Sequence, residues 1–367
     1  MAANRTIVFI GGYSEDIRLG TGQLVQGKSV GIDAYELNEE SGTLVHLTSV
    51  AERNPSYLVL SSDGKYLYAT NELKEYQGQA SSAAAAYAWE NDELRLLNRY
   101  PTWGTDAAHL IVDAQDKFLY VTNFMSGSTC VFPINEDGSL STPSCFLQHK
   151  GSSVNEKRQA GPHAHATEFN KDQSLALVSD LGCDKIFIYK TNEMGYLSYA
   201  EPASINMKPG SGPRHCVFHP EYRYLCSINE MTSSIDVFDW NDGNPVQEPV
   251  QHISTLPEDF TEHSSCAAIK FDPAGKFLYA SNRGHNSIAV YAFDAEAGQL
   301  TLTGHFSSGG EIPRDFDITP DGKFLICSNQ ASGNLVVFSI DAETGALTEL
   351  SRIEGVGTPT CVAAFTY

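Results

Sequence analysis

A phrase of about fifty residues recurs along this chain and limits its fold more than any other feature. Each copy contains a short apolar strand, a turn of the Asp-Gly-Lys kind and a second strand that ends in Asn or Asp. The second strands end at residues spaced 52, 57, 49, 53 and 47 apart: Asn71, Asn123, Asp180, Asn229, Asn282 and Asn329. Alternating apolar residues on either side of such a turn predict a β-hairpin. Because a third and a fourth short strand follow each hairpin, the repeat is typical of a four-stranded propeller blade.

Six full copies leave strand-like segments over at both ends of the chain. The C-terminal GTPTCVAAFTY has the pattern of a lone first strand, and the N-terminal RTIVFIGGY, GIDAYELN and LVHLTSV have the pattern of the other three. Joining them closes the ring and removes the exposed sheet edges. We therefore expect an all-β fold, a seven-bladed β-propeller whose last blade combines N- and C-terminal strands. Since no linker interrupts the period, residues 1–367 are expected to form a single domain.

Two segments depart from the regular period. The Ala-rich QASSAAAAYAWE, residues 79–90, is expected to form a strand of the first blade after an irregular loop. A second irregular loop runs from Lys150 to Ala160.

Composition disfavours several classes of function. The chain has 45 acidic and 24 basic residues, a formal charge of −21, which argues against nucleic acid and anionic membranes as partners. The apolar run from Ile7 to Ile10 is too short for a signal peptide, and no stretch approaches the ~20 apolar residues of a membrane helix. The eight cysteines include no C-x-x-C pair, which favours a reduced, cytoplasmic protein.

The repeat aligns the residues expected at one mouth of the central channel. In a propeller the first strand of each blade lines the channel, and it starts at the rim where the second, antiparallel strand ends. The starts of the first strands hold Ser56, His109, His165, Arg214, Ala267, Arg314 and Thr360. The positions just after the second strands hold Glu72, Phe124, Leu181, Glu230, Arg283 and Gln330. Charged groups gathered at a channel mouth are costly unless they bind something, so we expect a site there.

The residue types at this mouth suit acid–base chemistry on an anionic substrate. A zinc site needs three or four ligands, whereas His163 and His165 supply two, so His163 is a second site residue, part of a metal pair, or structural. The chain contains no G-x-S-x-G motif and no glycine-rich phosphate loop. The arginines could instead pair structurally with Glu230 and Asp315. The further candidates for contact with a substrate are His163, His109, Arg314, Asp180 and Asn229.

Six segments, GPHAHATEFNKD, SDLG, GPRHCVFHP, INE, ASNRG and IPRDFDITPDGKFL, resemble the lactonase family of seven-bladed propellers. That family includes bacterial cycloisomerase-type 6-phosphogluconolactonases and fungal 3-carboxy-cis,cis-muconate cyclases. The resemblance covers essentially the whole chain, and the order PHxH, GPRH, NE, NR is its specific part. By motif, the family's catalytic residues fall on His165, Arg214, Glu230 and Arg283. PHAH offers both His163 and His165, and His165 is preferred because it occupies the same repeat position as Arg214.

The resemblance implies a lactone hydrolase that acts on an anionic sugar lactone, 6-phosphogluconolactone, without a metal or organic cofactor. In this hypothesis His165 handles the proton of the attacking water, and Glu230 orients or assists it. Arg214 and Arg283 stabilise the developing oxyanion and bind carboxylate or phosphate, while Arg314 adds charge. Two alternatives stay open, a muconate-lactonising cyclase that uses the same residues and a propeller scaffold without catalysis.

Overall fold

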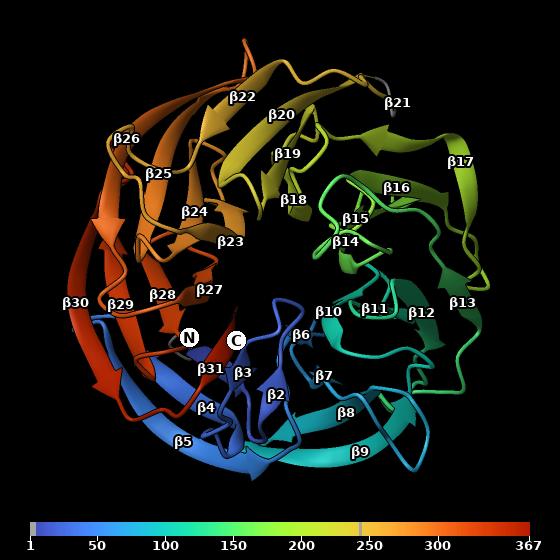
Figure 1. The fold of residues 1–367 in the computed structure, drawn as a ribbon. Coiled ribbons are helices and arrows are strands. Elements are labelled where there is room, and N and C mark those ends of the chain that lie inside the picture. The colour runs from blue at the N-terminus through green and yellow to red at the C-terminus, as the bar shows by residue number, and fades with distance from the viewer. Residues whose placement is uncertain (1–4, 242–243) are drawn as a thin grey trace.

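The computed structural model describes residues 5–241 and 244–367, which fold into seven blade-like β-sheets around a central axis (Figure 1). Strands are the only regular secondary structure found in these ranges. Residues 1–4, the start of the segment that we interpret as unlike a signal peptide, lie outside the described residues. Within the described chain, no helix is long and apolar enough to cross a membrane. The all-β, seven-bladed architecture expected from the repeat is confirmed.

The blades follow one another along the chain, each with antiparallel strands from the axis outward. Blade 1 contains β6 (Leu58–Leu60), β7 (Tyr66–Asn71), β8 (Ala83–Glu90) and β9 (Glu93–Pro101). Blade 2 contains β10 (Ala107–Val112), β11 (Phe118–Asn123), β12 (Ser128–Pro133) and β13 (Cys145–Gln148). Blade 3 contains β14 (Ala164–Phe169), β15 (Leu175–Asp180), β16 (Lys185–Lys190) and β17 (Ser198–Asn206). Blade 4 contains β18 (Pro213–Phe218), β19 (Tyr224–Asn229), β20 (Ser234–Asn241), the short β21 (Asn244–Pro245) and β22 (Gln251–Ser254). Blade 5 contains β23 (Ser265–Phe271), β24 (Phe277–Arg283), β25 (Ser287–Asp294) and β26 (Gln299–Ser307). Blade 6 contains β27 (Pro313–Ile318), β28 (Phe324–Asn329), β29 (Asn334–Ile340) and β30 (Leu347–Glu354).

Blade 7 is built from both ends of the chain. Its strand order is β31-β1-β4-β5, comprising β31 (Pro359–Thr366), β1 (Thr6–Gly12), β4 (Gly31–Asn38) and β5 (Thr43–Ala51). The innermost strand, β31, pairs antiparallel with β1 from Thr6 opposite Thr366 to Gly12 opposite Pro359. All seven residues of β1 are buried. The closure expected from the leftover strands is thereby confirmed, with β31 toward the centre of the ring in Figure 1.

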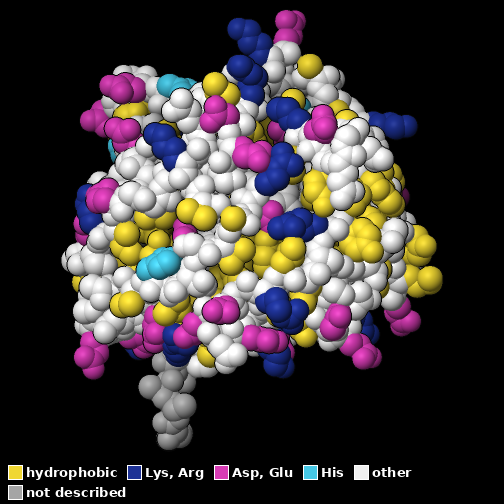
Figure 2. Space-filling view, turned by 90° about the horizontal axis from the view of Figure 1, so that it is seen from below, with side chains coloured by type: hydrophobic (Ala, Val, Ile, Leu, Met, Phe, Trp, Pro, Cys, Tyr) yellow, Lys and Arg dark blue, Asp and Glu magenta, His cyan; other side chains and the backbone are white. Residues whose placement is uncertain are grey.

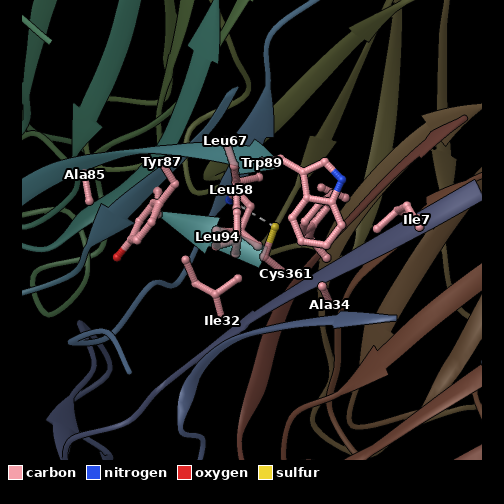
Figure 3. Close-up of a cluster of buried hydrophobic side chains, with 13 residues drawn as sticks. Ile7, Ile32, Ala34, Leu58, Leu67, Ala85, Tyr87, Trp89, Leu94 and Cys361 are labelled. Carbon is pink, nitrogen blue, oxygen red and sulfur yellow. Dashed lines mark hydrogen bonds between the residues drawn. The ribbon is translucent and has the colours of Figure 1, made fainter. Parts of the chain in front are cut away.

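Neighbouring blades are held together by apolar side chains packed between their sheets. Between blades 7 and 1, the rings of Phe9 and Trp89 meet edge to face with centroids 4.9 Å apart. In the same cluster the backbone N–H of Leu58 donates to the sulfur of Cys361 at 3.3 Å (Figure 3). Each large apolar side chain buried in this way contributes roughly 1.5–3 kcal/mol. Cys361 lies on β31, so the closing strand belongs to a core shared by two blades.

A short hairpin lies between β1 and β4 of blade 7. It was not predicted from the sequence. It consists of β2 (Ile17–Arg18) and β3 (Leu24–Val25) and lies toward the centre of the ring in Figure 1. At its base, the N–H of Ser29 donates to the carbonyl of Tyr13, and the N–H of Tyr13 donates to the carbonyl of Thr358, both at 3.0 Å. The hairpin is therefore fixed to the innermost strand of its own blade.

Candidate active site

A β-bulge at the start of the innermost strand positions three of the expected site residues. In blades 3, 4 and 6 the ladder skips one residue, at His165, Arg214 and Arg314. A bulge leaves its extra residue unpaired and changes the direction of its side chain. Arg214 accordingly reaches the next blade, where its Nη1 donates to the carbonyl oxygen of Ala267 at 2.7 Å. The bulges thus bring these side chains into contact with neighbouring blades, as His165 with Phe124 and Arg314 with Tyr13 also show.

In blade 2 the equivalent position holds Ala108 and not His109. The turn of this blade has Asp116 in the left-handed conformation (φ 53°) that Gly64 adopts in blade 1 (φ 70°). Alignment on the turn aspartate was therefore one residue out of register here, and a one-residue shift reverses the direction of a side chain. His109 occupies the ladder position of His215, deeper along the axis, and the two rings lie 5.4 Å apart.

The carboxylate of Glu230 contacts three arginines of the site. Its Oε1 accepts a hydrogen bond from Nη2 of Arg158 at 2.7 Å, and its Oε2 accepts one from Nη2 of Arg283 at 2.8 Å. The Nε of Arg214 lies 3.5 Å from the same Oε2. Glu230 and Arg214 are only 6% and 4% exposed. The structure therefore brings together Arg214, Glu230 and Arg283, as the sequence predicted.

Burial and charge fix the ionisation of these groups. Burial opposes the charge of Glu230, but Arg283, Arg158 and Arg214 outweigh it and hold the pKa of this carboxyl well below its usual range. Burial, followed by the charges of Arg283 and Arg314, lowers the pKa of Arg214 to about 9. The site therefore holds a permanent carboxylate among excess positive charge. The outer face shown in Figure 2 instead mixes acidic and basic side chains.

His165 is buried in a layer of rings next to this charged group. Its ring lies 5.1 Å from that of His215 and 5.4 Å from that of Phe124, measured between centroids. Burial and the charge of Arg214 lower the pKa of His165 well below 6.5. The imidazole is therefore neutral at pH 7 and able to accept a proton.

Three buried nitrogens of the site have no hydrogen-bond partner among the described residues. They are Nε of Arg214, Nε of Arg283 and Nδ1 of His165. Buried polar atoms in native proteins are nearly always satisfied, so unpaired ones point to an additional partner. Two cationic donors and one imidazole nitrogen suit an anionic ligand and a water molecule. Among the described residues, no group of three or more His, Cys, Asp or Glu side chains could hold a metal ion.

A cavity of about 690 Å³ opens at this end of the propeller. The charged residues that line it are Lys28, Arg158, Glu230, Arg283 and Arg314. The β2–β3 hairpin supplies one wall through Leu19, Leu24 and Val25, among others. Gly20 in this hairpin packs on blade 2, because a Cβ there would lie only 2.6 Å from the ring of Phe124. The hairpin therefore roofs part of the cavity from blade 7 to blade 2.

Arg314 reaches the cavity from blade 6 and is held by the base of the hairpin. Its Nη2 donates to the hydroxyl of Tyr13 at 3.1 Å, and that hydroxyl donates to Oε2 of Glu72 at 3.0 Å. Glu72 and Tyr13 are both buried. The charge of Arg314 is thus partly balanced through Tyr13. The repeat could not predict this contact, because Tyr13 precedes the unanticipated hairpin.

Arg214 and His165 are not among the residues that line this cavity, and Arg214 reaches it only through Glu230, whose Oε2 lies 3.5 Å from its Nε. Three further candidates also lie outside the cavity. His163 stacks on the ring of Phe124 at 4.8 Å, with its Nδ1 3.1 Å from that residue's carbonyl oxygen. Asp180 is fully buried, with its carboxylate 2.6 Å from Nδ1 of His149 and accepting the N–H of His163 at 2.8 Å. Asn229 is fully buried and donates to side chains of its own blade. Their polar groups stabilise strand ends and loops, and none of them lines the cavity.

Arg158 is the arginine of the site that the sequence analysis missed. It lies in the irregular Lys150–Ala160 loop, which belongs to no repeat and so offers no register for alignment. The loop is fixed to blade 3 because the buried Gln159 donates its amide to the carbonyl of Leu181 at 2.9 Å. The only signal in the sequence was the departure of this loop from the period.

Comparison with known proteins identifies a matching family and several similar proteins. The family described as "Lactonase, 7-bladed beta-propeller" matches residues 7–364. A 6-phosphogluconolactonase of Bacillus subtilis is 36% identical over 296 residues, which cover 80% of this chain and 83% of the relative. A 6-phosphogluconolactonase of Formosa agariphila is 34% identical, with 85% and 86% covered. Among solved structures, the periplasmic gluconolactonase of Pseudomonas aeruginosa superposes with a TM-score of 0.89 at 28% identity, over 98% of this chain and 99% of that one.

Proposed function

We propose that this chain, which belongs to the lactonase family of seven-bladed β-propellers, hydrolyses 6-phosphogluconolactone to 6-phosphogluconate. Family membership and the two relatives that carry this name support the reaction class and the substrate. The observation that carries the proposal is the set of arginines around one buried carboxylate, with two guanidinium Nε groups that have no hydrogen-bond partner among the described residues. In a chain of net charge −21, such a site has to be built for an anion.

The first step is the attack of water on the lactone carbonyl. His165 accepts the proton of that water, because its lowered pKa leaves the imidazole neutral at pH 7 and its Nδ1 has no partner among the described residues. The carbonyl oxygen becomes an oxyanion as the new C–O bond forms. Arg214 and Arg283 stabilise this oxyanion through their Nε–H groups, which have no hydrogen-bond partner among the described residues.

The second step is the opening of the ring. The bond between the carbonyl carbon and the ring oxygen breaks, and that oxygen receives the proton held by His165. The new carboxylic acid ionises at neutral pH, so each turnover consumes one water and releases one proton. Glu230 remains ionised throughout, because its pKa is held well below its usual range. Its role is to keep Arg214 and Arg283 in place, and it does not transfer a proton.

We place this reaction in the cytoplasm and expect no nucleic acid or membrane partner. All eight cysteines are buried and free. Unpaired thiols in this number suit a reducing compartment. The net charge of −21 repels nucleic acid and anionic lipid surfaces, so the proposed partner is the small anionic substrate.

A substrate panel with purified protein tests the proposal. 6-Phosphogluconolactone, glucono-1,5-lactone and 3-carboxy-cis,cis-muconate are compared, with spontaneous hydrolysis subtracted. We expect the highest kcat/KM for the phosphorylated lactone, and Arg283→Gln should lower it about 100-fold. Arg352→Gln is the matched control, because Arg352 is exposed on β30 and its ion pairs within the described part of the chain are with Glu349 and Glu354 of its own strand. Turnover of the muconate alone would establish a cyclase, and no turnover of any compound would support a scaffold.

A further inference from the structure

We propose that Arg158 recognises the phosphate group of the substrate and thereby selects phosphorylated over unphosphorylated lactones. The inference rests on the proposed lactone hydrolysis and adds the residue that decides which lactone is used. Three arginines contact Glu230, and they differ in depth. The exposed fraction of the side chain is 5% for Arg214, 12% for Arg283 and 20% for Arg158. Arg158 is therefore the one nearest to the solvent side of the cavity.

The two oxygens of Glu230 separate Arg158 from the reacting end of the site. Oε2 faces Arg214 and Arg283, the donors that we assign to the oxyanion, whereas Oε1 accepts its hydrogen bond from Arg158. In 6-phosphogluconolactone the phosphate is carried on a carbon outside the lactone ring. With the carbonyl bound at the deep arginines, that carbon extends toward the opening. The guanidinium of Arg158, a planar fork of donors matched to phosphate oxygens, lines the same cavity and is the most exposed of the three arginines.

The charges of the cavity fit a phosphorylated ligand better than a neutral one. Four cationic residues and one carboxylate line the cavity, and Arg314 is only partly balanced through Tyr13 and Glu72. A neutral sugar lactone would leave this excess uncompensated. A phosphate monoester carries about −1.5 to −2 charges at pH 7, which offsets most of it.

The loop that presents Arg158 is held in place before any ligand binds. Ser153 donates its hydroxyl to Asp184 at 2.5 Å, and that carboxylate also accepts the N–H of Gly212 at the start of blade 4. The N–H of Arg158 itself donates to the side chain of Asn155 at 3.1 Å. Because the loop is ordered by these bonds, little conformational entropy is lost when the arginine takes up a phosphate.

The test is the ratio of two kcat/KM values, for 6-phosphogluconolactone and for glucono-1,5-lactone. Arg158→Gln should lower the value for the phosphorylated lactone about 10- to 100-fold, mainly through KM, as expected for the loss of a charge-assisted bond to phosphate. The value for glucono-1,5-lactone should fall by a clearly smaller factor, because that substrate loses no phosphate contact and only the bond between Arg158 and Glu230 is removed. Inorganic phosphate and 6-phosphogluconate should inhibit the variant more weakly than the wild type in the same assays.

Lys157→Gln is the matched control. It removes the same charge from the adjacent, exposed position of the loop, and Lys157 does not line the cavity. This variant should leave both kcat/KM values and both inhibition constants unchanged. An equal loss on both lactones in Arg158→Gln would overturn the inference and make Arg158 a positioning residue for Glu230. If the wild type hydrolyses neither lactone, the proposed function fails. If it hydrolyses both and the ratio is unaffected by Arg158→Gln, only the present inference fails.

Discussion

Replacing Arg214 with alanine should lower kcat/KM for 6-phosphogluconolactone about 100- to 1000-fold while the protein stays folded. A preorganised donor directed at a developing oxyanion is typically worth about 2.7–4 kcal/mol of transition-state stabilisation. Arg214 has the features of such a donor, because its side chain is almost fully buried and its Nε lacks a hydrogen-bond partner among the described residues. Its fixed position comes from the bond between Nη1 and the carbonyl of Ala267.

The free energy of unfolding should change much less than the activity in this variant. Without Arg214, Glu230 still accepts hydrogen bonds from Arg158 and Arg283, so no buried carboxylate is left unpaired. The carbonyl of Ala267 loses its donor, which costs about 1–3 kcal/mol if no water replaces it. The substitution also removes an unfavourable interaction, because in the wild type the positive charges of Arg283 and Arg314 repel the guanidinium of Arg214 and lower its pKa. A Tm shift of only a few degrees follows.

Steady-state kinetics and thermal melting on the same preparation separate this account from a structural one. Arg214→Lys is the companion variant, since it keeps the charge and loses the planar fork of donors. We expect it to recover only part of the lost activity. Near-normal turnover in Arg214→Ala together with a large drop in Tm would show that Arg214 is a structural residue. Full activity in Arg214→Lys would show that the fork geometry is unimportant.

Three further outcomes are expected. The pKa of His165 is held well below 6.5, so this base takes up a proton only at lower pH. The kcat/KM for glucono-1,5-lactone should therefore be undiminished at pH 6.5, where an ordinary histidine is half protonated, and a fall in kcat/KM at or above pH 6.5 would contradict this. Deleting residues 358–367 removes β31, exposes the apolar cluster around Phe9 and Trp89 and opens the ring. We expect this variant to lose cooperative thermal unfolding, and a normal melting curve would refute the closure argument. Activity should survive incubation with EDTA, and its loss with recovery on adding a divalent ion would identify a metal enzyme.

The blade count and the central arginines could be predicted because the repeat sets both. Each hairpin ends at an equivalent Asn or Asp, so counting back from the turns located Arg214, and counting forward located Glu230 and Arg283. The bulge that changes the direction of Arg214 recurs at His165 and Arg314, so one register argument served all three. Periodicity therefore predicted those parts of the site that the repeated strands present.

The parts that could not be predicted lie where the repeat fails. His109 was assigned to the mouth because Asp116 was aligned with the turn aspartates, whereas it holds the left-handed position that glycine takes in other blades. Arg158 comes from a loop without any repeat register, and its contact with Glu230 depends on tertiary packing. The β2–β3 hairpin is only a few residues long, and its position depends on the contact between Gly20 and Phe124 far along the chain.

Proton release at constant pH tests the central claim most directly. Purified wild-type protein is added to 6-phosphogluconolactone in a pH-stat at neutral pH, and the uncatalysed rate is measured alongside. Hydrolysis predicts one proton released for each lactone consumed, at a rate proportional to the protein concentration and reduced to near the uncatalysed rate in Arg214→Ala. An unchanged rate of proton release on addition of the wild-type protein would contradict the claim that this site hydrolyses the lactone.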